Sequence, residues 1–300
     1  MKLTMNVGGL MKYFPHEEVC AMVRSAGFDS ADYSLEFMKD SEHMFGGSDY
    51  LAVAEGVRKT MENCGLPVTQ THAPFSFAKF ADPDVYRDFI YPSIVRSIEI
   101  SAALGADTII VHPLHHMLYS GHEEEIFQLN MEFYRSLIPV AQSCGIKIAV
   151  ENMFQKDPRR GIITHDTCST IPEFLRYIDT LDSPWITACL DVGHVGLPLQ
   201  KDEPWDFIRA LGHERLGALH IHDNNYKNDN HDLPYCGKID WVEVTKALGE
   251  IDYTGDFTYE VRLPGLTQFS DKELAAITLD YAGRIGKYLV TKVDANRPVK

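Results

Sequence analysis

Six acidic or imidazole residues follow short apolar runs at nearly regular intervals along the 300-residue chain. Each stands at the end of such a run, as in "IIVHP" and "IAVEN", and consecutive members are 40, 39, 40, 29 and 40 residues apart. Imidazole and carboxylate groups bind divalent metal ions and transfer protons, so these residues are a candidate catalytic or metal-binding set. The six residues are His72, His112, Glu151, Asp191, His220 and Glu260.

Bringing these groups together would place three carboxylates in one concavity. Glu151, Asp191 and Glu260 would repel one another and raise one another's pKa unless a cation neutralised them. Oxygen and imidazole ligands suit Mn²⁺, Mg²⁺, Co²⁺ or Zn²⁺. Taken singly, each residue also fits a structural role, such as a hydrogen-bonded histidine or a glutamate that caps a helix. Their recurrence at six consecutive strand ends favours the chemical interpretation.

The runs that carry these residues have the length and composition of β-strands, and segments of helical period separate them. Between 123 and 143, apolar residues recur every three or four positions, and Gly145 then marks a helix end. "TIPE" (170–173) reads as a capping box, "DWVE" (240–243) as a similar helix start, and a last helix covers roughly 271–289. The predicted strands are 3–7, 28–33, 67–72, 107–112, 146–151, 186–191, 215–222 and 256–260.

Eight strand–helix units without a low-complexity linker predict one α/β domain over residues 1–300, folded as a closed (β/α)8 barrel. The C-terminal ends of barrel strands converge on one mouth, where active sites form. A doubly wound open sheet would usually show a glycine-rich turn after its first strand, and "NVGGLMKYF" lacks that spacing. The stretch 152–169 is long for a strand-to-helix connection and is a candidate lid.

The composition narrows the class of protein. The formal charge of −15, from 28 Lys and Arg against 43 Asp and Glu, argues against a broad nucleic-acid-binding surface. The N-terminus lacks the apolar region of a signal peptide, and no apolar run is long enough to cross a bilayer. Six scattered cysteines without a C-x-x-C pair are typical of a reduced, cytoplasmic protein. A homo-oligomer is left open.

Six motifs, in their order and spacing, resemble those of the xylose isomerase-like barrel superfamily: "VHP", "VEN", "LDVGH", "HIHDN", "GKIDW" and "YEVR". The resemblance covers nearly the whole chain. This superfamily includes sugar and sugar-phosphate isomerases and epimerases, enzymes of inositol catabolism, dehydratases, and endonucleases of the endonuclease IV type. The resemblance therefore implies a metal-dependent enzyme acting on a sugar, a sugar phosphate or a cyclitol, without specifying which one or whether it is phosphorylated.

Carried over by position, the resemblance implies one divalent ion held by Glu151, Asp191, His220 and Glu260. His220 is preferred to His222 because it stands three residues before Asp223, as the ligand does in the family. Glu151 and Glu260 would also transfer the proton in an isomerase or epimerase that works through an enediolate. Contacts with the substrate are expected from His72, His112, His194, His222 and Arg262.

An alternative treats more of these residues as ligands of further zinc ions. With "DNH" (229–231), the chain matches in order the nine ligand types of the three-zinc endonucleases, which would make it a phosphodiesterase. A metal-dependent dehydratase or lyase is another alternative. A barrel kept only for sugar binding or assembly ranks lower, because the four-residue set is complete. The additional ligands would be His72, His112, His194, Asp229 and His231.

Overall fold

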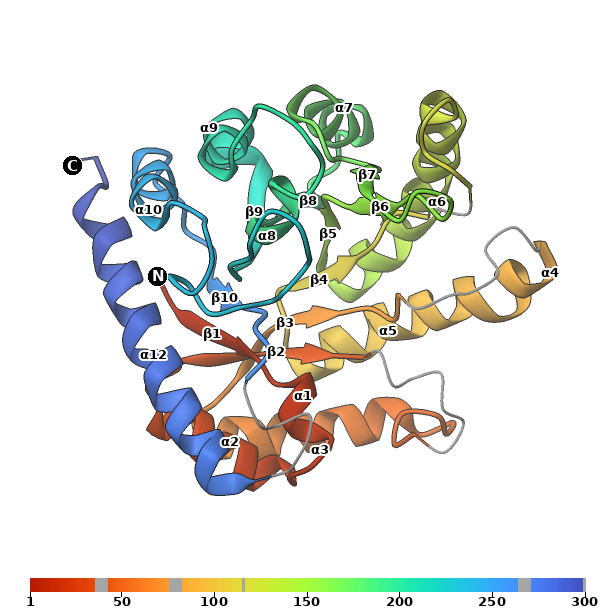
Figure 1. The fold of residues 1–300 in the computed structure, drawn as a ribbon. Coiled ribbons are helices and arrows are strands. Elements are labelled where there is room, and N and C mark those ends of the chain that lie inside the picture. The colour runs from red at the N-terminus through yellow and green to blue at the C-terminus, as the bar shows by residue number, and fades with distance from the viewer. Residues whose placement is uncertain (36–42, 76–82, 115–116, 264–270, 299–300) are drawn as a thin grey trace.

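A computed structural model describes residues 1–35, 43–75, 83–114, 117–263 and 271–298. Eight strands form one sheet with helices around it (Figure 1). All neighbouring pairs in the sheet are parallel. In sheet order the strands are β10 (Phe257–Tyr259), β1 (Leu3–Asn6), β2 (Ser30–Ser34), β3 (Val68–His72), β4 (Thr108–Val111), β5 (Lys147–Glu151), β8 (Ile186–Asp191) and β9 (Leu216–His220).

The two end strands of this order meet and close the barrel. Ile221 and Tyr259 form a parallel bridge just beyond β9. The backbone N–H of Ile221 donates to the carbonyl of Thr258 at 2.8 Å, and that of Glu260 donates to the carbonyl of Ile221 at 3.1 Å. The predicted (β/α)8 barrel is confirmed, and each predicted strand differs from the observed one by at most two residues at either end.

The helices connect the strands and cover the outer face of the sheet (Figure 1). Helix α6 spans the predicted segment and ends at Gly145, whose φ is 68°. Within the described ranges, no helix is long and apolar enough to cross a lipid bilayer. The helices are α1 (Gly8–Met11), α2 (His16–Ser25), α3 (Tyr50–Asn63), α4 (Pro83–Val85), a π-helical turn (Tyr86–Ile90), α5 (Tyr91–Leu104), α6 (Glu123–Cys144), α7 (Ile171–Leu181), α8 (Val192–Val195), α9 (Pro204–Arg215), α10 (Trp241–Glu250) and α12 (Lys272–Ala295).

The main hydrophobic core lies between the sheet and the helices. Leu3 and Met5 are buried and alternate along β1 with the inward-facing Thr4, as the period of a strand requires. A Cβ added at Gly286 of α12 would come within 2.6 Å of the Leu3 side chain. The glycine therefore lets the last helix approach the first strand closely.

In the segment between β5 and α7, the lid role of 152–169 stays a prediction, and the predicted capping box needs correction. Residues 152–169 contain an antiparallel hairpin, β6 (Phe154–Lys156) with β7 (Ile163–His165), so this connection is ordered secondary structure. The predicted capping box at 170–173 is wrong, because the Thr170 side chain caps nothing. The carboxylate of Glu173 instead accepts the N–H of Cys168 at 2.9 Å. At Cys168 the chain turns with a φ of 61°, which directs this N–H toward the glutamate. The predicted start of α10 is confirmed, since Asp240 accepts the N–H groups of Val242 and Glu243.

Glu173 gives a prediction about the pH dependence of stability. Burial raises the pKa of Glu173 from 4.5 to about 7. Because folding favours its protonated form, its contribution to stability is complete at low pH and is lost as the pH rises from about 4.5 to 7. Glu173→Gln removes the charge and keeps an oxygen acceptor. We expect this variant to raise the free energy of unfolding by about 1–3 kcal/mol at pH 8 and to change it little at pH 4.5.

Denaturant unfolding at the two pH values measures this difference. Glu273→Gln is the matched control, because Glu273 is an exposed glutamate in the first turn of α12. An equal change in stability at pH 4.5 and pH 8 for Glu173→Gln would contradict the burial argument.

Candidate functional site

The interior of the barrel explains why the predicted residues meet. A separate inner cluster consists of Ile110, Ala149, Cys189 and Ala218, one residue from each of four strands. Side chains two positions further along a strand point to the same side. Those positions hold His112, Glu151, Asp191 and His220. The layer above the apolar inner cluster is therefore made of imidazole and carboxylate groups.

Glu151 lies at the centre of one half of this layer and is buried. Its Oε1 lies 2.7 Å from Nδ1 of His220, and its Oε2 lies 2.7 Å from Nε2 of His112 and 3.6 Å from Nε2 of His72. Burial alone would raise the pKa of Glu151, but His220 and His112 outweigh burial and hold the pKa well below its usual range. The sequence predicted that crowded carboxylates raise one another's pKa; here the imidazoles reverse that direction.

Glu260 approaches the same imidazole from the neighbouring strand end. Its Oε2 lies 3.1 Å from Nδ1 of His220, and its side chain is 26% exposed where that of Glu151 is 1% exposed. The pKa of His220 is well above its usual value, because the two glutamates outweigh the effect of burial, which alone would lower it. The two candidate catalytic carboxylates therefore converge on one ring nitrogen.

Asp32 is a residue of this site that the sequence analysis missed. It is fully buried on β2, where its Oδ2 accepts a hydrogen bond from Asn6 at 2.9 Å and lies 3.8 Å from Nε2 of His220. Burial raises its pKa. Oδ1 of Asp32 and Nε2 of His220 have no hydrogen-bond partner within the described part of the chain. A carboxylate placed there can hold the second nitrogen of a ligating imidazole. The available signal was an acidic residue inside a short buried strand, "SADYS".

Asp191 organises the other half of the layer. It is the N-cap of α8, where its Oδ1 accepts the N–H of His194 at 2.9 Å and lies 2.9 Å from Nε2 of His222. Burial would raise the pKa of Asp191, but His194 and His222 hold it below its usual value. A Cβ added at Gly193 would lie 1.9 Å from the His222 ring. The glycine of "LDVGH" is therefore needed for His222 to reach the aspartate.

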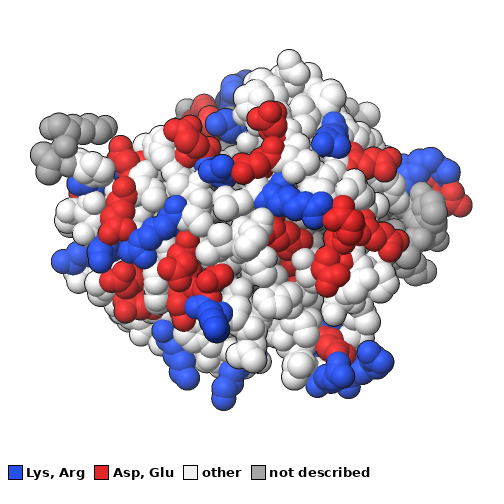
Figure 2. All heavy atoms as spheres, turned by 90° about the horizontal axis from the view of Figure 1, so that it is seen from above, with Lys and Arg blue, Asp and Glu red and all other residues white. Residues whose placement is uncertain are grey.

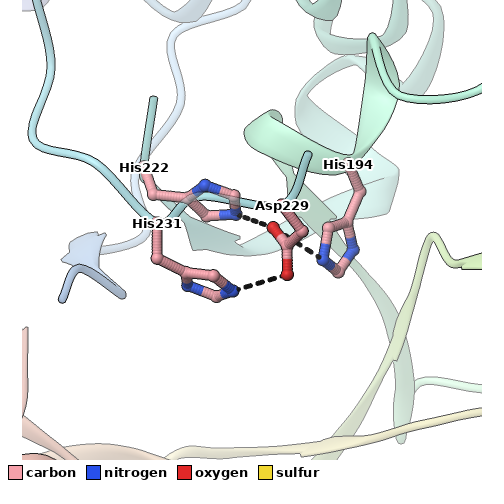
Figure 3. Close-up of side chains that lie close together, drawn as sticks. All are labelled: His194, His222, Asp229 and His231. Carbon is pink, nitrogen blue, oxygen red and sulfur yellow. Dashed lines mark hydrogen bonds and ion pairs between the residues drawn. The ribbon is translucent and has the colours of Figure 1, made fainter. Parts of the chain in front are cut away.

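Asp229 comes from the loop after β9 and lies among three imidazole rings (Figure 3). Its Oδ2 is 2.9 Å from Nε2 of His231, and its Oδ1 is 3.7 Å from His222 and 3.9 Å from His194. Burial is the largest single effect and would lower the pKa of His231, but the hydrogen bond with Asp229 and the charges of the neighbouring carboxylates together raise it to about 9. The rings of His222 and His231 stack with centroids 4.1 Å apart.

Asp223, the acidic residue of "HIHD", holds this loop in place. Its Oδ2 accepts the indole N–H of Trp241 at 2.9 Å, and its Oδ1 accepts the backbone N–H groups of Asn224 at 2.8 Å and Ile239 at 3.1 Å. A backbone bridge to Asp232 closes the loop between them. Asp223 is therefore a structural brace that returns Asp229 and His231 to the mouth.

The arrangement brings nearly all the predicted site residues together, in groups compatible with metal binding. Two donor atoms on one ion, each at about 2.0–2.3 Å, are at most about 4.6 Å apart, so donor atoms within 4.8 Å of one another need move little to share an ion. Within each of three groups of the described residues, one donor atom per residue lies within 4.8 Å of all the others. The groups are Glu151, Asp191, His220 and Glu260; His72, Glu151 and His220; and His194, His222, Asp229 and His231. His112 contacts Glu151 without completing a group.

Arg262, like His112, is a predicted site residue that lies outside these groups. It lines a neighbouring cavity of about 400 Å³ that Asp229, His231 and Glu260 also border. Its backbone N–H donates to the carbonyl of His231 at 2.8 Å, which fixes its main chain beside the site. The cavity is therefore continuous with the candidate metal-binding residues.

Known proteins resemble this chain in sequence and in fold. An uncharacterized protein from Methanocaldococcus jannaschii is 30% identical over 63% of this chain and 62% of its own length. A putative L-ribulose-5-phosphate 3-epimerase from Haemophilus influenzae is 22% identical over 84% of this chain and 85% of its own length. The crystal structure of a D-tagatose 3-epimerase-like protein superposes with a TM-score of 0.72 at 22% identity, covering 98% of this chain and 99% of that one.

The family comparison covers most of the barrel. A family model described as xylose isomerase-like TIM barrel matches residues 20–281, from α2 to α12. The matched range includes all the residues of the three groups described above. The chain therefore belongs to the xylose isomerase-like TIM barrel family.

Proposed function

We propose that this protein is a sugar epimerase or isomerase that removes a proton from the carbon beside a carbonyl and returns it. The observation that carries the proposal is the convergence of Glu151 and Glu260 on one nitrogen of His220, within a four-residue group of metal-compatible donors. The names of the two epimerase-like proteins described above support the same class of substrate. A small carbohydrate is the expected partner.

In this proposal a divalent ion, Mn²⁺, Mg²⁺, Co²⁺ or Zn²⁺, is held by Glu151, Asp191, His220 and Glu260. The donor set fits such an ion, because three carboxylates and one imidazole converge within 4.8 Å and the carboxylates need a cation to offset their repulsion. A bound ion would polarise the substrate carbonyl and make the neighbouring C–H more acidic.

In this proposal Glu151 and Glu260 each carry out one part of the proton transfer. Glu151 is buried, and each of its oxygens lies 2.7 Å from an imidazole nitrogen, which holds the carboxylate in the ionised form that can accept a proton but also makes it a weak base. Glu260 is the more exposed of the two and borders the cavity. When one carboxylate removes a proton from one face of the carbon and the other returns it to the opposite face, the carbon is inverted. Return to the adjacent carbon would give an isomerase instead.

The remaining histidines differ in what they can reach. We assign His72, His112 and His194 to substrate hydroxyls, because the His112 side chain is 16% exposed, and His72 and His194, although buried, are not fully enclosed as His222 is. His222 is fully buried against Asp191 and stacked on His231, so we assign it to holding Asp191. On the face seen in Figure 2, basic side chains are dispersed among acidic ones and no large area is basic alone. The net charge of −15 favours a small-molecule substrate over a nucleic acid.

The first test of this proposal is metal dependence. Removing metal with a chelator should lower the melting temperature and abolish activity, and Mn²⁺ or Co²⁺ should restore both, since a ligand at 100 times its Kd stabilises by about 3 kcal/mol. Thermal unfolding and elemental analysis measure the response. Glu151→Gln and Asp191→Asn should lose it, whereas Glu55→Gln, on the exposed face of α3, should keep it. Unchanged metal content in both site variants would exclude this site.

The second test follows the proton. Wild-type protein with a panel of ketoses and cyclitols in deuterated water should introduce deuterium at the carbon beside the carbonyl. Glu151→Gln and Glu260→Gln should slow this exchange by about 100-fold or more, as expected for loss of a general acid or base. Mass spectrometry measures the exchange, and metal content separates lost catalysis from lost binding. Turnover with neither exchange nor a primary isotope effect on a substrate deuterated at that carbon would contradict the mechanism.

A second candidate function is a multi-zinc phosphodiesterase. The observation that favours it is the completeness of the other two groups, which bring His72, Asp229 and His231 close enough to act as additional ligands. In that case the histidines that we assign to the substrate would hold further zinc ions, and the substrate would be a phosphodiester such as abasic DNA.

Counting bound metal separates the two functions. For the sugar enzyme we expect about one divalent ion per chain, and Asp229→Asn should leave that ion in place. Two or three zinc ions, reduced in number by Asp229→Asn and accompanied by cleavage of abasic DNA, would favour the phosphodiesterase instead. Inductively coupled plasma mass spectrometry of wild type and variant gives the count.

A further inference from the structure

Arg262 carries a charge that the described residues do not neutralise. The chain has 13 arginines. Eleven of them direct the guanidinium to a carboxylate or a backbone carbonyl. Across the ranges that the structure covers, only Arg159 and Arg262 have no side-chain hydrogen bond or ion pair. Both are exposed, but Arg159 lies beside the β6–β7 hairpin, whereas Arg262 also lines the cavity beside the candidate active site.

A second cation borders the same cavity. Lys12 follows α1, and Arg262 follows β10, so the parallel pairing of β1 with β10 brings the two residues to one wall. The net charge of the chain is −15, and the cavity of about 400 Å³ nevertheless has two basic residues on its lining. That volume lies in the range of small-molecule binding sites.

The acidic groups on the cavity already have counter-charges. Asp229 is paired with His231 at 2.9 Å, and Glu260 lies 3.1 Å from Nδ1 of His220. Among the described residues Arg262 has no such counter-charge, and its side chain is exposed to solvent. An anionic group on a ligand in this cavity would therefore meet an unpaired guanidinium at the wall.

We propose that this cavity binds the phosphate of a phosphorylated sugar whose carbonyl end lies against Glu151 and Glu260. The inference rests on the proposed function and narrows its substrate class. A guanidinium offers two parallel N–H donors to phosphate, and an ammonium adds a point charge. A phosphomonoester carries about −1.5 to −2 charges at neutral pH, and Arg262 offers it an unpaired cation, with Lys12 on the same lining. The Cα atoms of Glu260 and Arg262 are at most about 7 Å apart, which the carbon chain of a ketose can span.

The test compares ketopentoses and ketohexoses with the same sugars phosphorylated at the terminal carbon, L-ribulose and L-ribulose 5-phosphate among them. Wild-type protein should prefer the phosphorylated form. Arg262→Gln and Lys12→Gln should each reduce that preference, measured as the ratio of kcat/KM values, by about 10- to 100-fold. The loss should be in KM, because these contacts would bind substrate and transition state alike. Arg159→Gln is the matched control, since it removes the other unpaired arginine.

Three outcomes would overturn the inference while leaving the proposed function intact. They are equal use of free and phosphorylated sugars by the wild type, an equal loss toward both forms in Arg262→Gln, and preference for a sugar acid over a sugar phosphate. If no sugar is turned over, the proposed function fails, and titration with inorganic phosphate tests the cavity separately. Calorimetric binding to the wild type that is weakened in Arg262→Gln supports the anion site, and no binding to the wild type rejects it.

Discussion

The pairing of Glu151 with two imidazoles is the interaction on which the barrel mouth depends. A buried carboxylate without partners would cost several kcal/mol, and one whose oxygens both face imidazoles avoids most of that cost. His112 follows β4 and His220 ends β9, so the carboxylate at the end of β5 joins three strands. The residues at the barrel mouth that could bind a metal or transfer a proton are thus also those whose opposite charges compensate one another.

In the other half of the site, Asp191 is likewise a buried carboxylate whose charge neighbouring imidazoles compensate. Its carboxylate caps α8 and pairs with His222, and Asp229 then pairs with His231 one step further out. Carboxylates and imidazoles alternate from Glu151 to the loop after β9. The oxygens that face imidazoles are among those that could hold a metal ion, so a cation and protonated histidines are alternative ways of neutralising one set of charges.

Most of the barrel and its strand-end residues were predictable, because both follow from short-range rules. Side chains alternate along a strand, so a polar residue two positions after an inward apolar one must point into the barrel. Parallel strands then bring their carboxyl ends to one mouth. Glu151 and Asp191 obey both rules, and their sequence neighbours already identified them.

The rest depends on contacts between residues distant in sequence. Asp32 meets His220 only because closure of the barrel leaves just β10 and β1 between β9 and β2, and a single acidic residue in a short strand does not predict this contact. The carboxylate of Glu173 accepts the N–H of Cys168, at a turn, instead of taking part in the expected capping box. The role of Asp223 required Trp241 to fold back onto it. The acidic and imidazole residues at the strand ends can thus be recognised from their sequence neighbours. The residues that orient them and contact the substrate depend on the closure of the barrel and on its loops. Relatives that keep the strand-end residues and vary the loops can therefore share one barrel and differ in their substrates.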